Sequence, residues 1–157
     1  MEKHKDGEHP FGDAGQIILF LLFIAIWTAD SFFFRYTTFL AKYIHVYIRI
    51  AISVAVIAGV IKLIRSSHYI VSEEAGTSRK LETEGVYSFV RHPMYMGALL
   101  FYESLLVLTF SLAAFVFYLL VFIFYNYIAS YEEKILEEEF GEEYLEYKKN
   151  TGRWMPR

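Results

Sequence analysis

Two polar clusters flank the last long apolar stretch of this chain, and the first is Arg91-His92-Pro93. Pro93 disfavours a helical conformation for the residue before it and is well tolerated in the first turn of a helix, so we expect a helix to begin here. A helix start offers unpaired N–H groups and partial positive charge, which suit a carboxylate or a phosphate. Alternatively, Arg91 and His92 only fix the helix at a membrane interface.

The second cluster begins with Glu132-Glu133, forty residues further on. One of these carboxylates could accept hydrogen bonds from hydroxyl or ammonium groups of a ligand, or the pair could simply be a solvated helix start. Tyrosines near both clusters could line a site for a ring-bearing cofactor, or belong to the aromatic belt of a membrane interface. These are Tyr87, Tyr95, Tyr131, Tyr144 and Tyr147.

Two further carboxylates, Asp30 and Glu103, lie inside apolar runs. A carboxylate within a membrane is costly and is a candidate functional group, although a hydrogen-bonded structural role is the alternative for both. Glu103 follows Tyr95 by eight residues, or about two helical turns. We therefore expect Glu103 to face the same cavity as Tyr95.

The elements that must position these residues are membrane helices, because 55% of the 157 residues are hydrophobic and a spanning helix needs about 20 mostly apolar residues. Spans are predicted over residues 16–34 and 43–64, followed by a polar connection over 65–90. The apolar stretch 95–128 suits a tight hairpin that turns near 109–111, at the far interface. The predicted fold class is an all-α integral membrane protein with about four transmembrane helices.

The polar segments predict the orientation of the chain. Most of its 15 Lys and Arg fall before the first span, in the connection or after the hairpin. This bias makes both termini and both polar clusters cytoplasmic in a multi-pass protein. A C-terminal helix is expected over 131–147, bent at Gly141. We interpret 1–157 as one membrane domain, with two spans in 1–64 and the site in 65–157. The charged residues 1–15 lack a cleavage site, so the first span is expected to be retained.

Several classes of function are disfavoured. The absence of cysteine excludes disulfides, thiolate metal sites and a cysteine nucleophile, and no other spacing is typical of a metal site. A net charge of −3 without a basic patch gives no indication of nucleic-acid binding.

Taken together, the motifs resemble the isoprenylcysteine carboxyl methyltransferase family, in a wider group that includes phospholipid N-methyltransferases. The resemblance covers about residues 66–156. It rests on Leu81-x-Thr83-x-Gly85-Val86-Tyr87, then Arg91-His92-Pro93-x-Tyr95-x-Gly97, then Glu132-Glu133-x-x-Leu136-x-x-x-Phe140-Gly141-x-x-Tyr144-x-x-Tyr147.

The resemblance implies that S-adenosyl-L-methionine is bound at the cytoplasmic face and leaves as S-adenosyl-L-homocysteine, and that the methyl acceptor is a lipophilic molecule or lipid. Methyl transfer from a sulfonium is an in-line displacement that depends on positioning and water exclusion. Catalytic roles are expected for Glu132, Arg91 and Glu103. Cofactor contacts are expected from Arg79, Lys80, Leu81, Glu82, Tyr87, His92, Pro93, Met94, Tyr95, Gly97, Glu132, Glu133 and Tyr144.

One position departs from the isoprenylcysteine branch, which carries an Arg about one helical turn before the glutamate pair. This chain has Ile128 there, and Arg153 is a possible substitute from the tail. A carboxylate acceptor needs such a cation, so an amine, a thiol or a phospholipid head group becomes more plausible. Two other classes stay open: an NADPH-dependent membrane reductase, which shares a similar Arg-His-Pro-x-Tyr-x-Gly hairpin, and a non-catalytic membrane scaffold.

Overall fold

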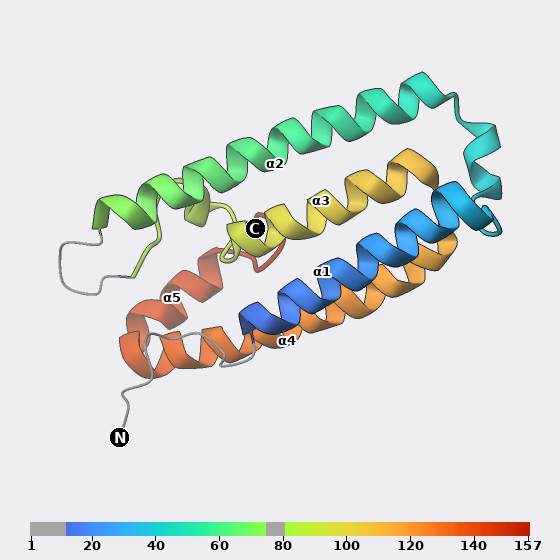
Figure 1. Cartoon of the computed structure of the whole chain (residues 1–157). Helices are drawn as coiled ribbons and strands as arrows, with labels where there is room; N and C mark the ends of the chain where they lie inside the picture. Colours follow the sequence, from blue (N-terminus) through green and yellow to red (C-terminus); the bar gives the residue numbers. More distant parts are fainter. Residues whose placement is uncertain (1–11, 75–80) are drawn as a thin grey trace.

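The computed structural model describes residues 12–74 and 81–157, without the side chains of 68–74. Its elements are helices that run side by side (Figure 1). Helix α1 (Gly12–Thr28) continues as a π-helical segment, Ala29–Phe34, and a 3₁₀ segment, Phe39–Tyr43, precedes α2 (Val46–Glu74). After a single 3₁₀ turn, Gly85–Ser88, the chain forms α3 (Pro93–Thr109), α4 (Leu112–Phe140) and α5 (Glu142–Asn150).

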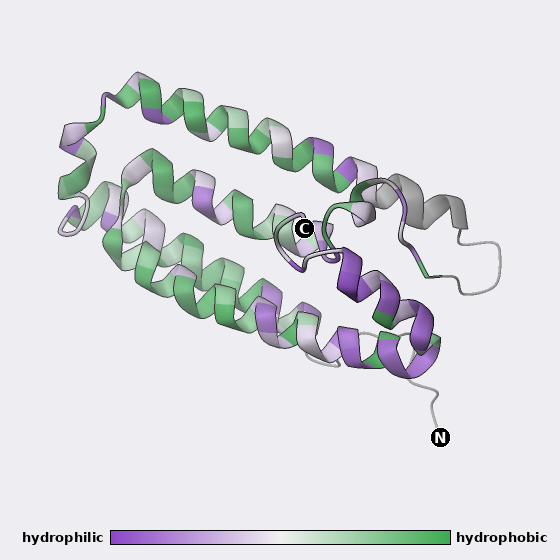
Figure 2. Ribbon diagram, turned by 180° about the vertical axis from the view of Figure 1, so that it is seen from behind, coloured by the Kyte–Doolittle hydropathy of each residue, from purple (hydrophilic) through white to green (hydrophobic). Residues whose placement is uncertain are grey.

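Three helical segments of the described chain are long and apolar enough to cross a membrane: Gly12–Phe34, Val46–Ser67 and Leu112–Phe140. Helix α3 is apolar but shorter, with 17 residues. Figure 2 shows the apolar residues along the lengths of these helices, and polar residues over α5 and the adjoining end of α4. The structure therefore confirms the prediction of an all-α membrane protein.

The predicted hairpin turn is also confirmed. Phe110 ends α3 in the left-handed conformation, with φ of 54°, and its N–H donates to the carbonyl of Leu106. Ser111 then caps α4 by accepting a hydrogen bond from the N–H of Ala114. The hydroxyl of Ser111 donates to the buried carboxylate of Asp30 at 2.6 Å. Of the two readings of Asp30, these contacts support the structural one.

Helix α1 packs against the hairpin, and α2 packs along α3. Phe23 of α1 is fully buried, with its ring edge on Tyr102 of α3 at a centroid distance of 4.7 Å. On the α2 side, a Cβ added to Gly97 would lie 3.1 Å from a side-chain carbon of Ile64. Gly97 thus faces α2 and has a packing role, and its contact with the cofactor stays a prediction.

The C-terminal part differs from the prediction in one respect. We expected a separate helix from residue 131, but α4 continues without a break to Phe140. Gly141, with φ of 55°, then redirects the chain into α5, which confirms the expected bend. The start of α1, the start of α3, the end of α4 and α5 all lie at one end of the bundle (Figure 1). This end carries both polar clusters.

Candidate functional site

The first polar cluster forms the entrance to α3, as predicted. His92 is the N-cap residue, with φ of −124° and ψ of 65°, and Pro93 occupies the first helical position. The N–H of Met96 is the first in this helix to pair with a backbone carbonyl, that of His92. Pro93 has no N–H, and the start of α3 presents the partial positive charge of a helix N-terminus, which suits an anion.

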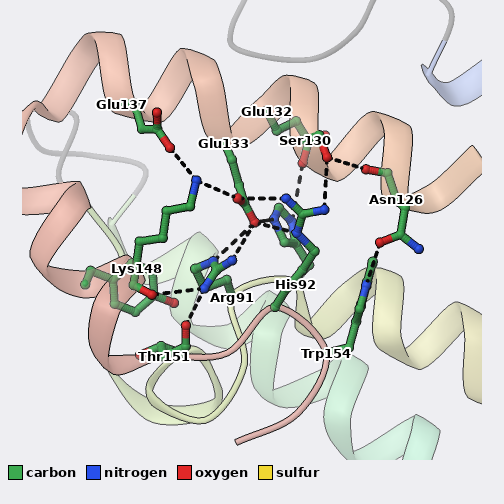
Figure 3. Close-up of polar contacts among 12 residues, drawn as sticks. Arg91, His92, Asn126, Ser130, Glu132, Glu133, Glu137, Lys148, Thr151 and Trp154 are labelled. Carbon is green, nitrogen blue, oxygen red and sulfur yellow. Dashed lines mark hydrogen bonds and ion pairs between the residues drawn. The ribbon is translucent and has the colours of Figure 1, made fainter. Parts of the chain in front are cut away.

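Glu133 is the centre of the second cluster and is 1% exposed (Figure 3). Arg91 donates to its Oε1 through Nε and Nη2, at 3.2 and 2.9 Å. Arg153 donates through Nε to Oε1 at 2.8 Å and through Nη2 to Oε2 at 2.9 Å. The ammonium of Lys148 is 3.1 Å from Oε2. Three cationic side chains therefore surround one carboxylate.

This arrangement gives Glu133 a structural role, and its predicted contact with the cofactor stays a prediction. Its carboxylate is enclosed by protein donors, and it is not part of the wall of either cavity described below. A carboxylate that already accepts this many charge-assisted hydrogen bonds is poorly suited to bind a ligand as well. Glu133 instead fixes the positions of Arg91 and Arg153, and with them the segments from which these residues come.

The last residues of the chain form a strap over this cluster, which the sequence analysis did not predict. Arg91 donates its backbone N–H to the carbonyl of Gly152 at 3.0 Å, and its guanidinium donates to the carbonyl of Thr151. The Trp154 indole donates to the Asn126 side chain of α4 at 2.9 Å. The sequence signal for the strap is weak, because only Gly152 and an isolated tryptophan mark it.

A cavity of about 320 Å³, here called the α3 cavity, opens beside the start of α3. Residues of both polar clusters line it: Tyr87, Arg91, His92, Pro93, Met94, Tyr95, Glu132 and Leu136. The hydroxyl of Tyr95 donates to the carboxylate of Glu132, which joins the two clusters. The first turn of α1 supplies the remaining wall, through Gly12, Asp13 and Gln16. The sequence analysis assigned no site role to these three residues.

A second cavity of about 200 Å³, here called the tyrosine cavity, adjoins the first. Both share Tyr87, Arg91 and Leu136, and the second adds Leu81, Glu82, Phe140, Tyr144 and Tyr147. Tyr147 is held in place because its hydroxyl donates to the carbonyl of Tyr87 at 2.7 Å. Tyr144 is 1% exposed, and its hydroxyl has no hydrogen-bond partner among the described residues. A buried hydroxyl without a partner is unfavourable unless a ligand or water satisfies it.

His92 lies between the two glutamates. Burial is the main cause that lowers its pKa, and the hydrogen bond to Glu133 opposes this shift only in part. The imidazole is therefore neutral at pH 7, with one N–H. Its Nε2 is 3.3 Å from Glu133 Oε1, whereas Nδ1 is 3.6 Å from Glu132 Oε2, too far for a hydrogen bond. We assign the proton to Nε2, which leaves Nδ1 as an acceptor beside Glu132.

Some of the residues predicted to belong to the site do not line either of these two cavities. Glu103 lines a separate cavity near the hairpin turn and is not part of the α3 cavity, so its predicted proximity to Tyr95 is wrong. Eight residues rotate a helix by about 80° beyond two full turns, which carries Glu103 to another face. Tyr131 is 37% exposed and lines neither of the two site cavities. Arg79 and Lys80 lie outside the described residues.

The fold and the site define a class: a multi-pass helical membrane protein with a ligand-sized cavity at the start of a helical hairpin, braced by a buried ion cluster. The chain belongs to the phospholipid methyltransferase family, whose family model matches residues 41–143. It is also similar to protein-S-isoprenylcysteine O-methyltransferase of Xenopus laevis, with 38% identity over 95 residues. This match covers 57% of the chain but 31% of the relative, so the chain spans about a third of that protein's length.

Proposed function

We propose that this protein transfers a methyl group from S-adenosyl-L-methionine to a lipophilic acceptor at the cytoplasmic membrane face. The observation that carries the proposal is the α3 cavity, where the start of α3, the Glu132 carboxylate and aromatic walls meet. Family membership supports methyl transfer as the reaction. The lysines and arginines near the cavity end of the bundle support the cytoplasmic assignment.

The residues around the two cavities match the chemical groups of this cofactor. The first N–H groups of α3 suit the methionyl carboxylate. Glu132 and the Nδ1 atom of His92 are acceptors 3.6 Å apart, so an ammonium or a ribose hydroxyl placed between them would donate to both. The aromatic wall of the tyrosine cavity and the buried hydroxyl of Tyr144 suit a purine ring with polar edges.

The bound cofactor supplies a methyl group activated by its positive sulfur, so the chain needs little acid–base chemistry. Its residues act by binding and orientation. The ion cluster at Glu133 holds Arg91 and the strap against α4, and thereby fixes the wall that faces the ligand. Tyr95 fixes the Glu132 carboxylate through its hydroxyl. The buried Pro93 and half-buried Tyr95 limit the access of water to the start of α3.

The charges of the site support an amine-bearing acceptor over a carboxylate. Ile128 is 1% exposed and provides no cation. Arg153 does reach this region, because it donates to Ser130 Oγ at 2.9 Å, but its guanidinium is paired with Glu133. The α3 cavity itself contains the carboxyl groups of Asp13 and Glu132. A carboxylate acceptor would face these two groups without a free cation among the described residues of the cavity wall.

The test is calorimetric titration of the detergent-purified chain with S-adenosyl-L-homocysteine, with NADPH titrated in parallel. We expect binding of the former and none of the latter. Glu132→Gln keeps the side-chain shape but removes the charge, and should weaken binding about tenfold or more. Glu138→Gln changes an exposed glutamate of the same helix and is the matched control.

Binding of NADPH alone would support the reductase reading. Equal affinity of the wild-type chain and Glu132→Gln would contradict the proposed site. Turnover is measured on the same preparation with a radiolabelled methyl donor and two acceptors, phosphatidylethanolamine and N-acetyl-S-farnesylcysteine. We expect label in the amine lipid. Label in the farnesylcysteine alone would assign the protein to carboxyl methylation and overturn the acceptor class.

A further inference from the structure

Glu103 lies on a cavity that the proposed methyl-transfer site does not use. This space, here called the hairpin cavity, has a volume of about 410 Å³ and is enclosed by α3, α4 and the turn between them. Leu106, Phe110 and Phe115 form apolar parts of its wall. Glu103 is exposed to it, and the Tyr118 hydroxyl donates to Glu103 Oε1 at 2.6 Å across the hairpin.

The position of Glu103 along α3 places it in the hydrocarbon region. It is six residues before the end of the helix, or about 9 Å from the turn, and about 16 Å from His92. An ionisable side chain at such a depth is expensive and usually has a functional partner. A water-soluble ligand is poorly suited to a cavity with these walls at this depth, so the expected occupant is a membrane component.

The hydrogen-bonding capacity of the cavity limits the chemistry of that occupant. Ser111 is already used, because it donates to Asp30 and accepts from Ala114. Tyr118 uses its one proton on Glu103 Oε1 and keeps acceptor capacity only. Within the described part of the chain, Glu103 Oε2 has no hydrogen-bond donor. The cavity therefore presents acceptors, and a ligand must supply the donor.

Aromatic residues continue along α4 beyond the hairpin cavity. Phe115 and Tyr118 of the cavity are followed by Phe122 at helical spacing, so all three lie on one face. Trp154 packs on Phe122, with ring centroids 6.1 Å apart, and bonds to Asn126 one turn later. The C-terminal strap thus contacts α4 one turn beyond the hairpin cavity, on the side of the α3 cavity.

We infer that the hairpin cavity binds a membrane amphiphile with one apolar chain and a hydrogen-bond-donating head, a hydroxyl or an amine, held by Glu103 and Tyr118. The apolar chain lies along the groove between α3 and α4. A fatty acid in its carboxylate form and an ester both lack the donor and are excluded by the same contacts. This inference does not depend on the methyl-transfer reaction.

The experiment uses three photoreactive probes with the same C16 chain and a diazirine at the same carbon: hexadecanol, hexadecylamine and palmitic acid. The full chain in lipid nanodiscs at pH 7.5 is irradiated with each probe, and the labelled peptides are mapped by mass spectrometry. We expect saturable labelling of residues 103–118 by the alcohol, the amine or both. Glu103→Leu should reduce that labelling about tenfold, as expected for the loss of a hydrogen bond to a charged group.

Two further variants keep the test decisive if Glu103→Leu unfolds. Glu103→Gln retains an acceptor for Tyr118 and for an alcohol but has no charge, so we expect it to abolish labelling by the amine and spare labelling by the alcohol. Leu120→Ala changes an exposed residue on α4 outside the cavity and should leave labelling unchanged. Unfolding temperatures show which variants remain folded.

Equal labelling by all three probes would overturn the inference, because it would describe a groove that any acyl chain fills. Unchanged labelling in both Glu103 variants would do the same. So would cross-links between two copies of the chain at residues 103–118, which would assign the cavity to a dimer interface.

Discussion

The two ends of the α3–α4 hairpin each contain a buried carboxylate, and the two carboxylates have different partners. At the turn, Asp30 accepts from the hydroxyls of Ser111 and Thr37 and from the backbone N–H of Thr37. At the opposite end, Glu133 is surrounded by Arg91, Arg153 and Lys148. Asp30 is thus bound by short neutral donors, whereas Glu133 is bound by long cationic side chains.

The different partners of the two carboxylates indicate a different role for each end of the hairpin. The donors to Asp30 also cap α4, since Ser111 accepts from Ala114 and the hydroxyl of Thr37 accepts from the N–H of Ala113. Every one of these groups is used within the protein. At the Glu133 end, Glu132 and His92 lie beside the ion cluster and line the wall of the α3 cavity. One end therefore closes a turn, and the other supports a ligand site.

The largest expected effect is that of Glu133→Gln, which would break the ion cluster. The amide cannot neutralise the facing guanidinium groups, and buried charges without a partner are strongly destabilising. We expect a loss of about 3–5 kcal/mol in the free energy of unfolding, measured by thermal unfolding in detergent. Lys148→Ala removes a cation whose side chain is 36% exposed, and should cost less than about 1 kcal/mol. Similar losses in both variants would show that Glu133 is not the centre of the cluster.

A smaller effect is expected at the turn. Asp30→Asn retains one acceptor oxygen but replaces the other with a donor that faces Ser111 or Thr37, and should cost about 1–3 kcal/mol. Because the turn lies at the far end of the bundle, the affinity for S-adenosyl-L-homocysteine should stay within about twofold of wild type. If Asp30 and Ser111 act as a unit, the losses in Asp30→Asn and Ser111→Ala will not add in the double variant. A large loss of ligand affinity in Asp30→Asn would contradict the division between the two ends.

The sequence was sufficient for the features that depend on length and local backbone chemistry. The apolar stretch 95–128 is too long for one span, which predicted the hairpin, and His92-Pro93 predicted the start of α3. Gly141 predicted the bend after α4. These features follow from one segment at a time, so neighbouring helices were not needed to predict them.

The roles of adjacent carboxylates could not be predicted in this way. Glu132 and Glu133 differ by about 100° around α4, and the packing of that helix decides which one faces the cavity. The same limitation applies to Glu103. The prediction that it faces the same cavity as Tyr95 ignored the rotation by which eight residues exceed two full helical turns. Asp13 and Gln16 show no motif at all, and only the packing of α1 beside the hairpin brings them to the cavity. Such features depend on how whole helices are rotated and placed.

The smallest expected effect concerns the protonation of His92. The pH dependence of ligand affinity should change when His92 is replaced and should not change when Asp30, at the other end of the hairpin, is replaced. Burial lowers the pKa of His92 below its usual value of about 6.5. The neutral ring keeps Nδ1 as an acceptor for the ligand, and protonation at low pH replaces this acceptor with a donor. The affinity for S-adenosyl-L-homocysteine should therefore be constant from pH 8 to about 6.5 and fall, by less than about tenfold, only at lower pH.

Calorimetric titrations between pH 5 and 8 would measure this dependence. His92→Asn should bind more weakly at every pH and lack the step below pH 6.5, because its side chain does not titrate in this range. Asp30→Asn, altered at the opposite end of the hairpin, should keep the wild-type profile. The same step in His92→Asn would assign the titration to another group, and an affinity that rises as the pH falls in the wild-type chain would mean that the ring binds its ligand in the protonated form. In either case the neutral Nδ1 acceptor would no longer support the proposed binding of S-adenosyl-L-homocysteine at the Glu133 end.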